Sequence, residues 1–127
     1  MFRCEKMPSE IYTEKRPWGS FTRLAHKKKC TVKIIEVKPR QMLSLQYHLH
    51  RVELWIALDS GIKVQVGNKQ KMLPKGKMIT IPKKAKHRLI GGSKTARILE
   101  ISTGNVRESD IVRLEDNYGR IKKKPWR

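Results

Sequence analysis

The sequence predicts an all-β fold, either a sandwich or a barrel, and three observations support this class. Apolar and polar residues alternate with period two over several short stretches, most clearly over residues 62–66. Glycine, proline and asparagine separate these stretches at even spacing, which is typical of turns between short strands. Strong helical periodicity is absent up to residue 102. Such a fold brings segments that are distant in sequence into contact.

The first half of the chain predicts strands that end at turn residues. Residues 21–24 form the first expected strand, and the three lysines at 27–29 mark a hairpin tip. Residues 31–38 alternate and are rich in β-branched side chains, which favours a strand. Pro39 ends this strand and leads into the next one, at residues 43–50.

The second half repeats this pattern of short strands and tight turns. The apolar run at 54–58 stops at residues 59–61, where Gly61 supplies the positive φ that a tight hairpin needs. The remaining expected strands cover residues 62–66, 70–73, 78–81, 88–90 and 96–102.

A chain of 127 residues is expected to form one domain around a single core. Residues 1–15 are polar and irregular and predict an N-terminal arm, residues 16–120 predict the barrel, and the basic residues 121–127 predict a tail. A short helix or loop is expected at 108–114, because a serine and an aspartate there offer an N-cap.

The formal charge of +19, from 30 basic and 11 acidic side chains, predicts a surface that attracts anions such as nucleic acid, acidic lipid or a phosphorylated metabolite. The basic residues form short, dispersed groups, and none belongs to a recognisable nucleic-acid module with interleaved aromatics. A solvated positive surface is therefore the favoured interpretation, and nucleic-acid binding is a minor alternative.

No apolar run reaches the roughly 18 residues that a membrane span needs, and the N-terminus lacks a signal-peptide core. The two cysteines fit neither a disulfide framework nor a zinc ribbon. We therefore expect a cytoplasmic protein that does not bind a membrane.

Candidate metal ligands gather at the end of the expected strand at 43–50. Side chains alternate in a strand, so Gln46, His48 and His50 would share one face. Glu53 follows closely, and a barrel can bring the distant His87 beside them. Two imidazoles, a carboxylate and a third imidazole form a site for one zinc, manganese, iron, cobalt or nickel ion. The alternative is a solvated face whose histidines and glutamate bind no metal.

Two spacings resemble the signature motifs of the cupin superfamily, which are small jelly-roll barrels of the double-stranded β-helix type that hold a metal with three histidines and one glutamate. The first motif is carried by His48, His50, Glu53 and Gly61, and the second by Gly76, Pro82 and His87. The resemblance implies that the metal ligands are His48, His50, Glu53 and His87. Gln46 is an alternative neutral ligand, because Glu53 lies nearer to His50 than in the general motif.

Four longer stretches resemble the C-terminal cupin domain of the type II phosphomannose isomerases, which often follows a mannose-1-phosphate guanylyltransferase domain. These stretches are residues 16–19, 43–55, 81–89 and 110–120. The resemblance implies a stand-alone, metal-dependent mannose-6-phosphate isomerase that acts on a small phosphorylated sugar and forms a homodimer.

The chain departs from the family pattern in four ways. Arg40 and Lys84 replace usual glycines, and Gly91 replaces the asparagine that ends the second motif. The run from Glu53 to Gly61 is one residue longer than usual, which indicates a bulge. These departures concern loop geometry more than the ligand set.

The resemblance also implies roles in isomerisation, which moves a proton between C1 and C2 of the open-chain sugar through an enediolate. The arginine of the family's Tyr-Gly-Arg element corresponds to Arg120, which we expect to bind the phosphate or the enediolate oxygen. Arg16 and Arg88 are secondary candidates for phosphate contacts. The candidate bases are Glu53, Glu100 and a metal-bound hydroxide, although a structural role is favoured for Glu100.

Two other functions are compatible with the same fold. An iron-dependent dioxygenase would use a similar set of histidine and carboxylate ligands with open positions. A non-catalytic metal-containing cupin would bind a sugar phosphate or another anionic partner, in keeping with the charge of +19. The long match that ends at Arg120 favours the isomerase over both.

Overall fold

The computed structural model describes residues 11–121, and these residues form strands, turns and loops with no helix. The strands are β1 (Tyr12–Arg16), β2 (Gly19–Arg23), β3 (Cys30–Val37), β4 (Leu45–Tyr47), β5 (Arg51–Ala57), β6 (Ile62–Val66), β7 (Lys69–Leu73), β8 (Met78–Ile81), β9 (His87–Ile90), β10 (Ala96–Gly104) and β11 (Val112–Glu115). Residues 1–10 and 122–127 lie outside the described residues, and with them most of the predicted arm and tail.

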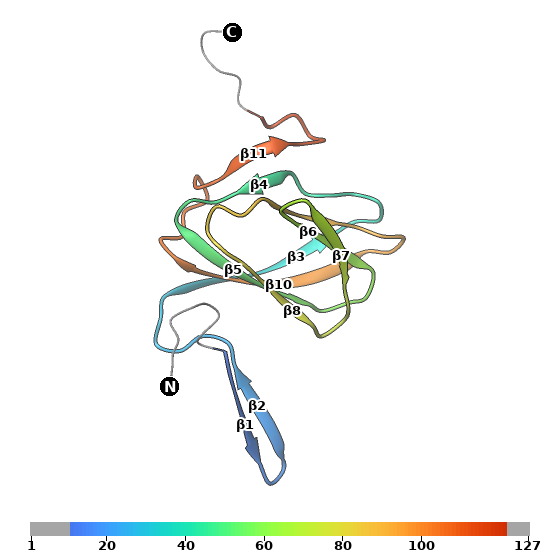
Figure 1. Cartoon of the computed structure of the whole chain (residues 1–127). Coiled ribbons are helices and arrows are strands. Elements are labelled where there is room, and N and C mark those ends of the chain that lie inside the picture. The colour runs from blue at the N-terminus through green and yellow to red at the C-terminus, as the bar shows by residue number, and fades with distance from the viewer. Residues whose placement is uncertain (1–10, 122–127) are drawn as a thin grey trace.

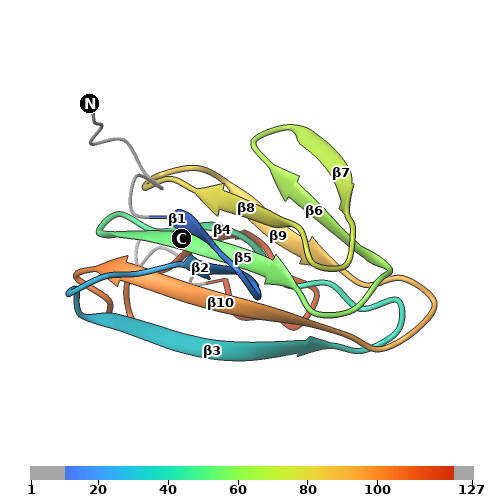
Figure 2. The ribbon, with the colours of Figure 1, turned by 90° about the horizontal axis from the view of Figure 1, so that it is seen from below.

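Two sheets form the body of the barrel (Figure 1). One has the order β3-β10-β5-β8, and Figure 2 shows these four strands side by side. The other has the order β11-β4-β9-β6-β7. Non-consecutive strands are neighbours in both sheets, so residues near 50 and near 87 lie within one barrel as the sequence predicted.

The core follows from the alternation in the strands. In β6, Ile62 and Val64 are fully buried while Lys63 between them is exposed. In β10, Ala96 and Ile98 are buried while Arg97 is exposed. Period-two patterning thus places one face of β6 and of the first part of β10 in the interior.

Strands β4 and β9 pair at a single position, Gln46 opposite His87. By contrast, β10 pairs with β3 from Ala96 to Thr103. Beyond the strand ends, Leu43 donates its backbone N–H to the Leu89 carbonyl (3.0 Å), which continues the contact on one side. The two strands therefore meet over a short length, next to a predicted metal ligand.

Strands β1 and β2 form a separate hairpin that projects from the barrel (Figure 1). It joins residues on both sides of the boundary predicted at residue 16. Trp18 at its tip is 74% exposed, and Tyr12 and Phe21 are also exposed. An isolated two-stranded hairpin is only marginally stable in water.

Of the helix or loop expected at 108–114, the structure has the loop: these residues form turns and the first part of β11, which pairs with β4. The predicted N-cap residue Asp110 does act as a cap, but for another segment. Its carboxylate accepts the backbone N–H groups of Leu49 and His50, each at 2.9 Å. A tertiary contact thus replaces the local helix-capping interaction.

At the two positions where the family pattern has glycine, this chain has other residues, but the backbone still has the positive φ that favours glycine. Arg40 has φ +60° and Lys84 has φ +68°. The Arg40 N–H donates to the Gly92 carbonyl and the Lys84 N–H to the His48 carbonyl, at 2.8 and 2.7 Å. Both turns are therefore made by residues held in the left-handed region, which costs L-residues about 1–2 kcal/mol.

Replacing Arg40 or Lys84 with glycine is expected to raise the free energy of unfolding by about 0.5–1 kcal/mol each. Relief of the left-handed strain exceeds the entropy that glycine adds to the unfolded chain. Urea unfolding measures the change. Lys83→Gly is the control, because Lys83 has no positive φ and should lose stability. A lower free energy of unfolding in all three variants would contradict the assignment of backbone strain to Arg40 and Lys84.

Candidate metal centre

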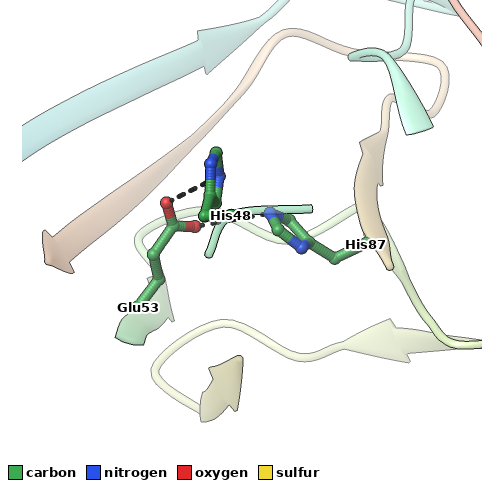
Figure 3. Close-up of side chains that lie close together, drawn as sticks. All are labelled: His48, Glu53 and His87. Carbon is green, nitrogen blue, oxygen red and sulfur yellow. Dashed lines mark ion pairs between the residues drawn. The ribbon is translucent and has the colours of Figure 1, made fainter. Parts of the chain in front are cut away.

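Three buried side chains converge inside the barrel (Figure 3). His48 directly follows β4, Glu53 lies on β5 and His87 opens β9, so the two sheets supply opposite sides of the cluster. One potential ligand atom from each residue lies within 4.8 Å of the others. The three residues are 1–2% exposed.

Backbone carbonyls fix the orientation of both imidazole rings. His48 Nδ1 lies 2.5 Å from the Asp110 carbonyl oxygen, and His87 Nδ1 lies 2.8 Å from the Ala85 carbonyl oxygen. A carbonyl only accepts, so each Nδ1 carries the proton and donates it. In the neutral ring this leaves the lone pair on Nε2, which faces Glu53 in both cases.

The centre of the cluster holds more acceptors than donors. Glu53 Oε2 lies 3.1 Å from His48 Nε2, and Glu53 Oε1 lies 3.6 Å from His87 Nε2. Among residues 11–121, neither Glu53 Oε2 nor His87 Nε2 has an aligned hydrogen-bond partner. Apart from the Arg51 guanidinium, which lies 3.1 Å from Glu53 Oε2, these buried acceptors could be satisfied by a cation bound between them.

The surroundings tune the charge of the cluster. Burial alone would raise the pKa of Glu53, but the contact with His48 and the charges of His87, His48 and Arg51 outweigh burial and lower the pKa. Burial lowers the pKa of His87 despite the hydrogen bond to Ala85. A carboxylate and a neutral imidazole are the forms that bind metal ions.

A second buried carboxyl group lies behind the first. Trp55 Nε1 lies 3.1 Å from Glu53 Oε1 and 3.2 Å from Glu100 Oε2, so one indole N–H serves both. Burial, followed by the charge of Glu53, raises the pKa of Glu100 to about 7. At neutral pH the pair thus consists of an ionised Glu53 and a Glu100 that is partly protonated.

This donor set fits a divalent ion. Two imidazole nitrogens and a carboxylate oxygen suit zinc, iron, manganese, cobalt or nickel, and leave positions open for a substrate. The unsatisfied Glu53 Oε2 and His87 Nε2 are the atoms that an ion would satisfy.

The structure places the other two predicted ligands differently. Strand β4 ends at Tyr47 and the chain bends at residues 49 and 50, so the predicted alternation does not reach His50, which is exposed and outside the cluster. Gln46 lies beside the cluster: its Oε1 accepts from the Ser44 hydroxyl (2.6 Å) and its Nε2 lies 3.4 Å from His48 Nε2.

The three predicted substrate arginines lie outside the cluster. Arg16 pairs with Glu14 on the projecting hairpin. Arg88 is buried beside His87 but donates to the Leu43 carbonyl and to Glu115 (2.9 and 3.1 Å). Side chains alternate along β9, so Arg88 points away from the face that carries His87.

Arg120 lies at a separate pocket of about 780 Å³. Its guanidinium donates from Nε and Nη2 to the two carboxylate oxygens of Asp116, each at 2.8 Å. Tyr118 lines the same pocket and hydrogen-bonds Gln41 across it. None of the residues that line this pocket is one of the three clustered ligands.

Sequence reasoning missed the residues that hold the cluster in place. Asp110 fixes the bend at 49–50 through its carboxylate and the His48 ring through its carbonyl. Arg51 is 5% exposed and contacts both His48 and Glu53. Asp110 opens the last matched stretch and Arg51 lies inside an earlier one, but neither contact is encoded in local spacing.

Replacing Asp110 with alanine is expected to weaken divalent-ion binding by about tenfold and to cost about 2 kcal/mol of stability. The stability falls because the bend that positions His48 would lose two charge-assisted hydrogen bonds. The ion affinity falls because substitution of residues that orient metal ligands typically weakens metal binding by about 10- to 100-fold. Isothermal titration calorimetry and urea unfolding measure the two changes. Asp110→Asn, which keeps an acceptor, should lose less. Unchanged ion affinity in Asp110→Ala would contradict the role of this bend.

Comparison with known protein families gives one match over most of the chain. The family model described as "Mannose-6-phosphate isomerase C-terminal" matches residues 5–116. It covers both motif stretches and all three clustered ligands.

Two curated relatives show the same similarity. Mannose-1-phosphate guanylyltransferase ManC of Salmonella typhimurium is 36% identical over 117 residues, which are 91% of this chain and 24% of that protein. The alginate biosynthesis protein AlgA of Pseudomonas aeruginosa is 40% identical over 113 residues, 87% of this chain and 23% of that protein. The chain thus spans about a quarter of the length of these relatives.

Solved structures agree on the fold. A 3,4-ketoisomerase from Helicobacter canadensis superposes with a TM-score of 0.65 at 16% identity, over 82% of this chain and 86% of that one. The cupin domain of Schizosaccharomyces pombe Cnp3 gives 0.57 at 10% identity, over 75% and 64%. The predicted cupin double-stranded β-helix is confirmed. Between residues 11 and 121 the chain has no helix that could span a membrane.

Proposed function

Because this chain belongs to the family of mannose-6-phosphate isomerase C-terminal cupin domains, we propose that it is a metal-dependent isomerase that interconverts mannose 6-phosphate and fructose 6-phosphate. The observation that carries the proposal is the buried cluster of His48, Glu53 and His87, whose possible ligand atoms lie within 4.8 Å of one another. The curated relatives are named for other activities and are about four times longer, so the isomerase activity of this domain rests on its site.

We propose that His48, Glu53 and His87 bind one divalent ion, with the Gln46 amide beside them as a fourth candidate ligand. A bound ion would polarise the substrate carbonyl and stabilise the negative charge of an enediolate. Asp110 and Ala85 keep both imidazoles in the ligating tautomer. His50 is left outside this set because its side chain is exposed.

Proton transfer between C1 and C2 needs a group that both accepts and returns a proton near neutral pH. Glu100 meets this requirement, because burial and the Glu53 charge raise its pKa to about 7. Trp55 links it to Glu53, so its charge responds to the charge at the cluster. We therefore propose Glu100 as the proton acceptor and Glu53 as a ligand.

The phosphate of the substrate requires cationic donors, for which the planar fork of arginine is well suited. We propose Arg120 for this role, because it lines an open pocket that also exposes Tyr118. It would exchange its present partner, Asp116, for the phosphate. Arg88 and Arg16 are weaker candidates, since Arg88 is held by Glu115 and Arg16 lies on the hairpin.

We also propose that the protein acts as a homodimer. The projecting hairpin exposes Trp18 and Phe21, and an isolated hairpin is marginally stable. The outer face of edge strand β3 exposes Val32 and Ile34 at 56% and 62%, so this strand offers apolar surface and free backbone groups. Sedimentation equilibrium of the wild type and of Trp18→Ser tests this proposal; two monomeric proteins would contradict it.

The decisive experiment is a coupled assay of mannose 6-phosphate isomerisation by the purified protein, before and after chelation and with each divalent metal restored. We expect turnover that chelation abolishes, that metal restores, and that His48→Ala and Arg120→Ala reduce at least about 100-fold. His50→Ala is the matched control and should keep its turnover.

Folded protein that binds metal but shows no turnover with any metal would overturn the isomerase proposal. Oxygen uptake with bound iron would indicate a dioxygenase instead. Saturable binding of the sugar phosphate without turnover would indicate a non-catalytic cupin.

A further inference from the structure

The guanidinium of Arg51 lies inside the cluster of metal ligands. Arg51 opens β5 and is 5% exposed. Its Nη2 lies 3.0 Å from His48 Nε2, and its Nε lies 3.1 Å from Glu53 Oε2. A third contact, from Nη1 to the Arg107 carbonyl oxygen, is longer at 3.4 Å. One buried side chain thus reaches two of the three groups that would bind an ion.

The contact with His48 uses the atom that a metal would need. His48 Nδ1 donates to the Asp110 carbonyl, so Nε2 carries the single lone pair of the neutral ring. That lone pair can accept a hydrogen bond from Arg51 or bind an ion at about 2.1 Å, but not both. The two states of His48 exclude each other.

Charge leads to the same conclusion. In the structure, the positive charge of Arg51 balances the negative charge of Glu53 in an almost dry site. A divalent ion on the same carboxylate would leave the cluster with a large positive excess if the guanidinium stayed in place. Like charges at such distances repel strongly when water is excluded.

The fit of Arg51 is nevertheless incomplete. Its Nε lies at ion-pair distance from Glu53 Oε2, yet neither atom has an aligned hydrogen bond among the described residues. His87 Nε2 is not reached by the guanidinium and stays unpaired there. The arginine therefore satisfies one side of the cluster and leaves the other side unsatisfied, so an ion can still displace it.

We propose that Arg51 is an internal cation that competes with the divalent ion for His48 and Glu53, and that it must withdraw from His48 when the ion binds. Arg51 is thus a positioning residue that stabilises the ion-free site and sets the affinity for the metal. This inference rests on the metal centre proposed above, and its test measures ion binding without enzymatic activity.

The test compares the binding of Co²⁺ to wild type, Arg51→Met and Arg107→Met, by calorimetry and by the visible absorption of the bound ion. Methionine replaces the chain of arginine as far as Nε with an uncharged group and has no donor for the lone pair of His48. Arg51→Met should bind Co²⁺ at least about tenfold more tightly than wild type. Arg107→Met is the matched control: it removes the same charge from the exposed loop whose carbonyl contacts Arg51, and should stay within about twofold of wild type.

A second measurement separates competition from general loosening of the site. Without ion, Arg51→Met should unfold at a lower temperature than wild type, because Glu53 loses its partner. With saturating Co²⁺ it should recover, so the ion-induced rise in melting temperature should be larger in the variant. If Arg51→Met does not fold without ion, Arg51→Gln, which can still donate to Glu53, is measured for the same change in affinity.

Equal or weaker Co²⁺ affinity in Arg51→Met and Arg51→Gln would overturn the competition and leave the metal centre standing. An equal gain in Arg107→Met would also overturn it, because charge removal alone would then explain the result. No ion binding in wild type or in any variant would overturn the metal centre together with the competition. None of these outcomes depends on whether the protein has isomerase activity, because the test measures only ion binding and melting temperature.

Discussion

Replacing Glu53 with glutamine is expected to weaken divalent-ion binding by more than about 100-fold and to reduce stability without metal by about 3 kcal/mol. Glutamine keeps the shape of the side chain but removes the negative charge that attracts the ion. Changes to residues that only orient ligands already cost up to about 100-fold in affinity, and a direct ligand should cost more. The stability falls because Arg51 would be left as a buried charge without its partner.

Calorimetric titration with Zn²⁺ or Mn²⁺ and urea unfolding with chelator measure the two effects of Glu53→Gln. His50→Ala is the control that separates the two possible ligand sets. Since His50 is exposed after the bend at residues 49–50, its removal should change ion affinity by less than about twofold. Equal losses of affinity in both variants would show that His50 binds the ion and that the side chain must turn inward to do so.

The second large effect concerns Glu100 and pH. Without metal, the free energy of unfolding is expected to fall by about 3 kcal/mol between pH 4.5 and pH 8, and Glu100→Gln should remove most of this fall. Burial and the charge of Glu53 raise the pKa of Glu100 from 4.5 to about 7. Each unit of pKa shift is worth about 1.4 kcal/mol.

The sign follows from proton uptake. Between pH 4.5 and 7 the folded protein keeps a proton on Glu100 that the unfolded chain has lost, so the contribution of Glu100 to stability is fully present below pH 4.5 and is lost as pH rises through 7. Glu53 acts in the opposite direction at lower pH: its lowered pKa means that its contribution is present above 4.5 and is lost as the solution is acidified further. These two groups together favour maximum stability near pH 4.5.

Urea unfolding at pH 5, 6, 7 and 8 in the presence of chelator tests this profile. Glu36→Gln is the control, because Glu36 is an exposed carboxylate and its removal should leave the pH dependence as in wild type. A Glu100→Gln variant with the wild-type slope between pH 5 and 8 would contradict the assignment of the fall to Glu100.

The sequence predicted the fold from features that are local and repeated. Alternation placed Ile62 and Val64 inward, and glycine marked the turn at Gly61, where φ is +93°. These features can be predicted because the alternation of buried and exposed side chains and the need for a positive φ are written in the local sequence. The spacing of the two family motifs also led to Glu53 and His87.

Other features depend on contacts that no local pattern contains. His50 lies outside the cluster because Asp110, 60 residues away, holds the bend that ends the alternation. The same contact engages Asp110 with a distant segment, and residues 108–111 form the loop alternative of the expected helix or loop. Because Arg51 is charged, its sequence context predicts a surface residue. Its side chain is buried instead, because Glu53 and His48 supply partners for the guanidinium.

The short pairing of β4 with β9 has a consequence for motion. Within these two strands only Gln46 and His87 pair, and beyond the strand ends Leu43 bonds Leu89, whereas the β3 and β10 pairing extends over eight positions from Ala96 to Thr103. Local opening between β4 and β9 therefore breaks few hydrogen bonds and separates the His48 side from the His87 side. An ion held by both histidines would fasten these two strands together. Amide hydrogens around 45–48 should then exchange quickly in the ion-free protein and become protected when the ion binds, while those of β10 change little.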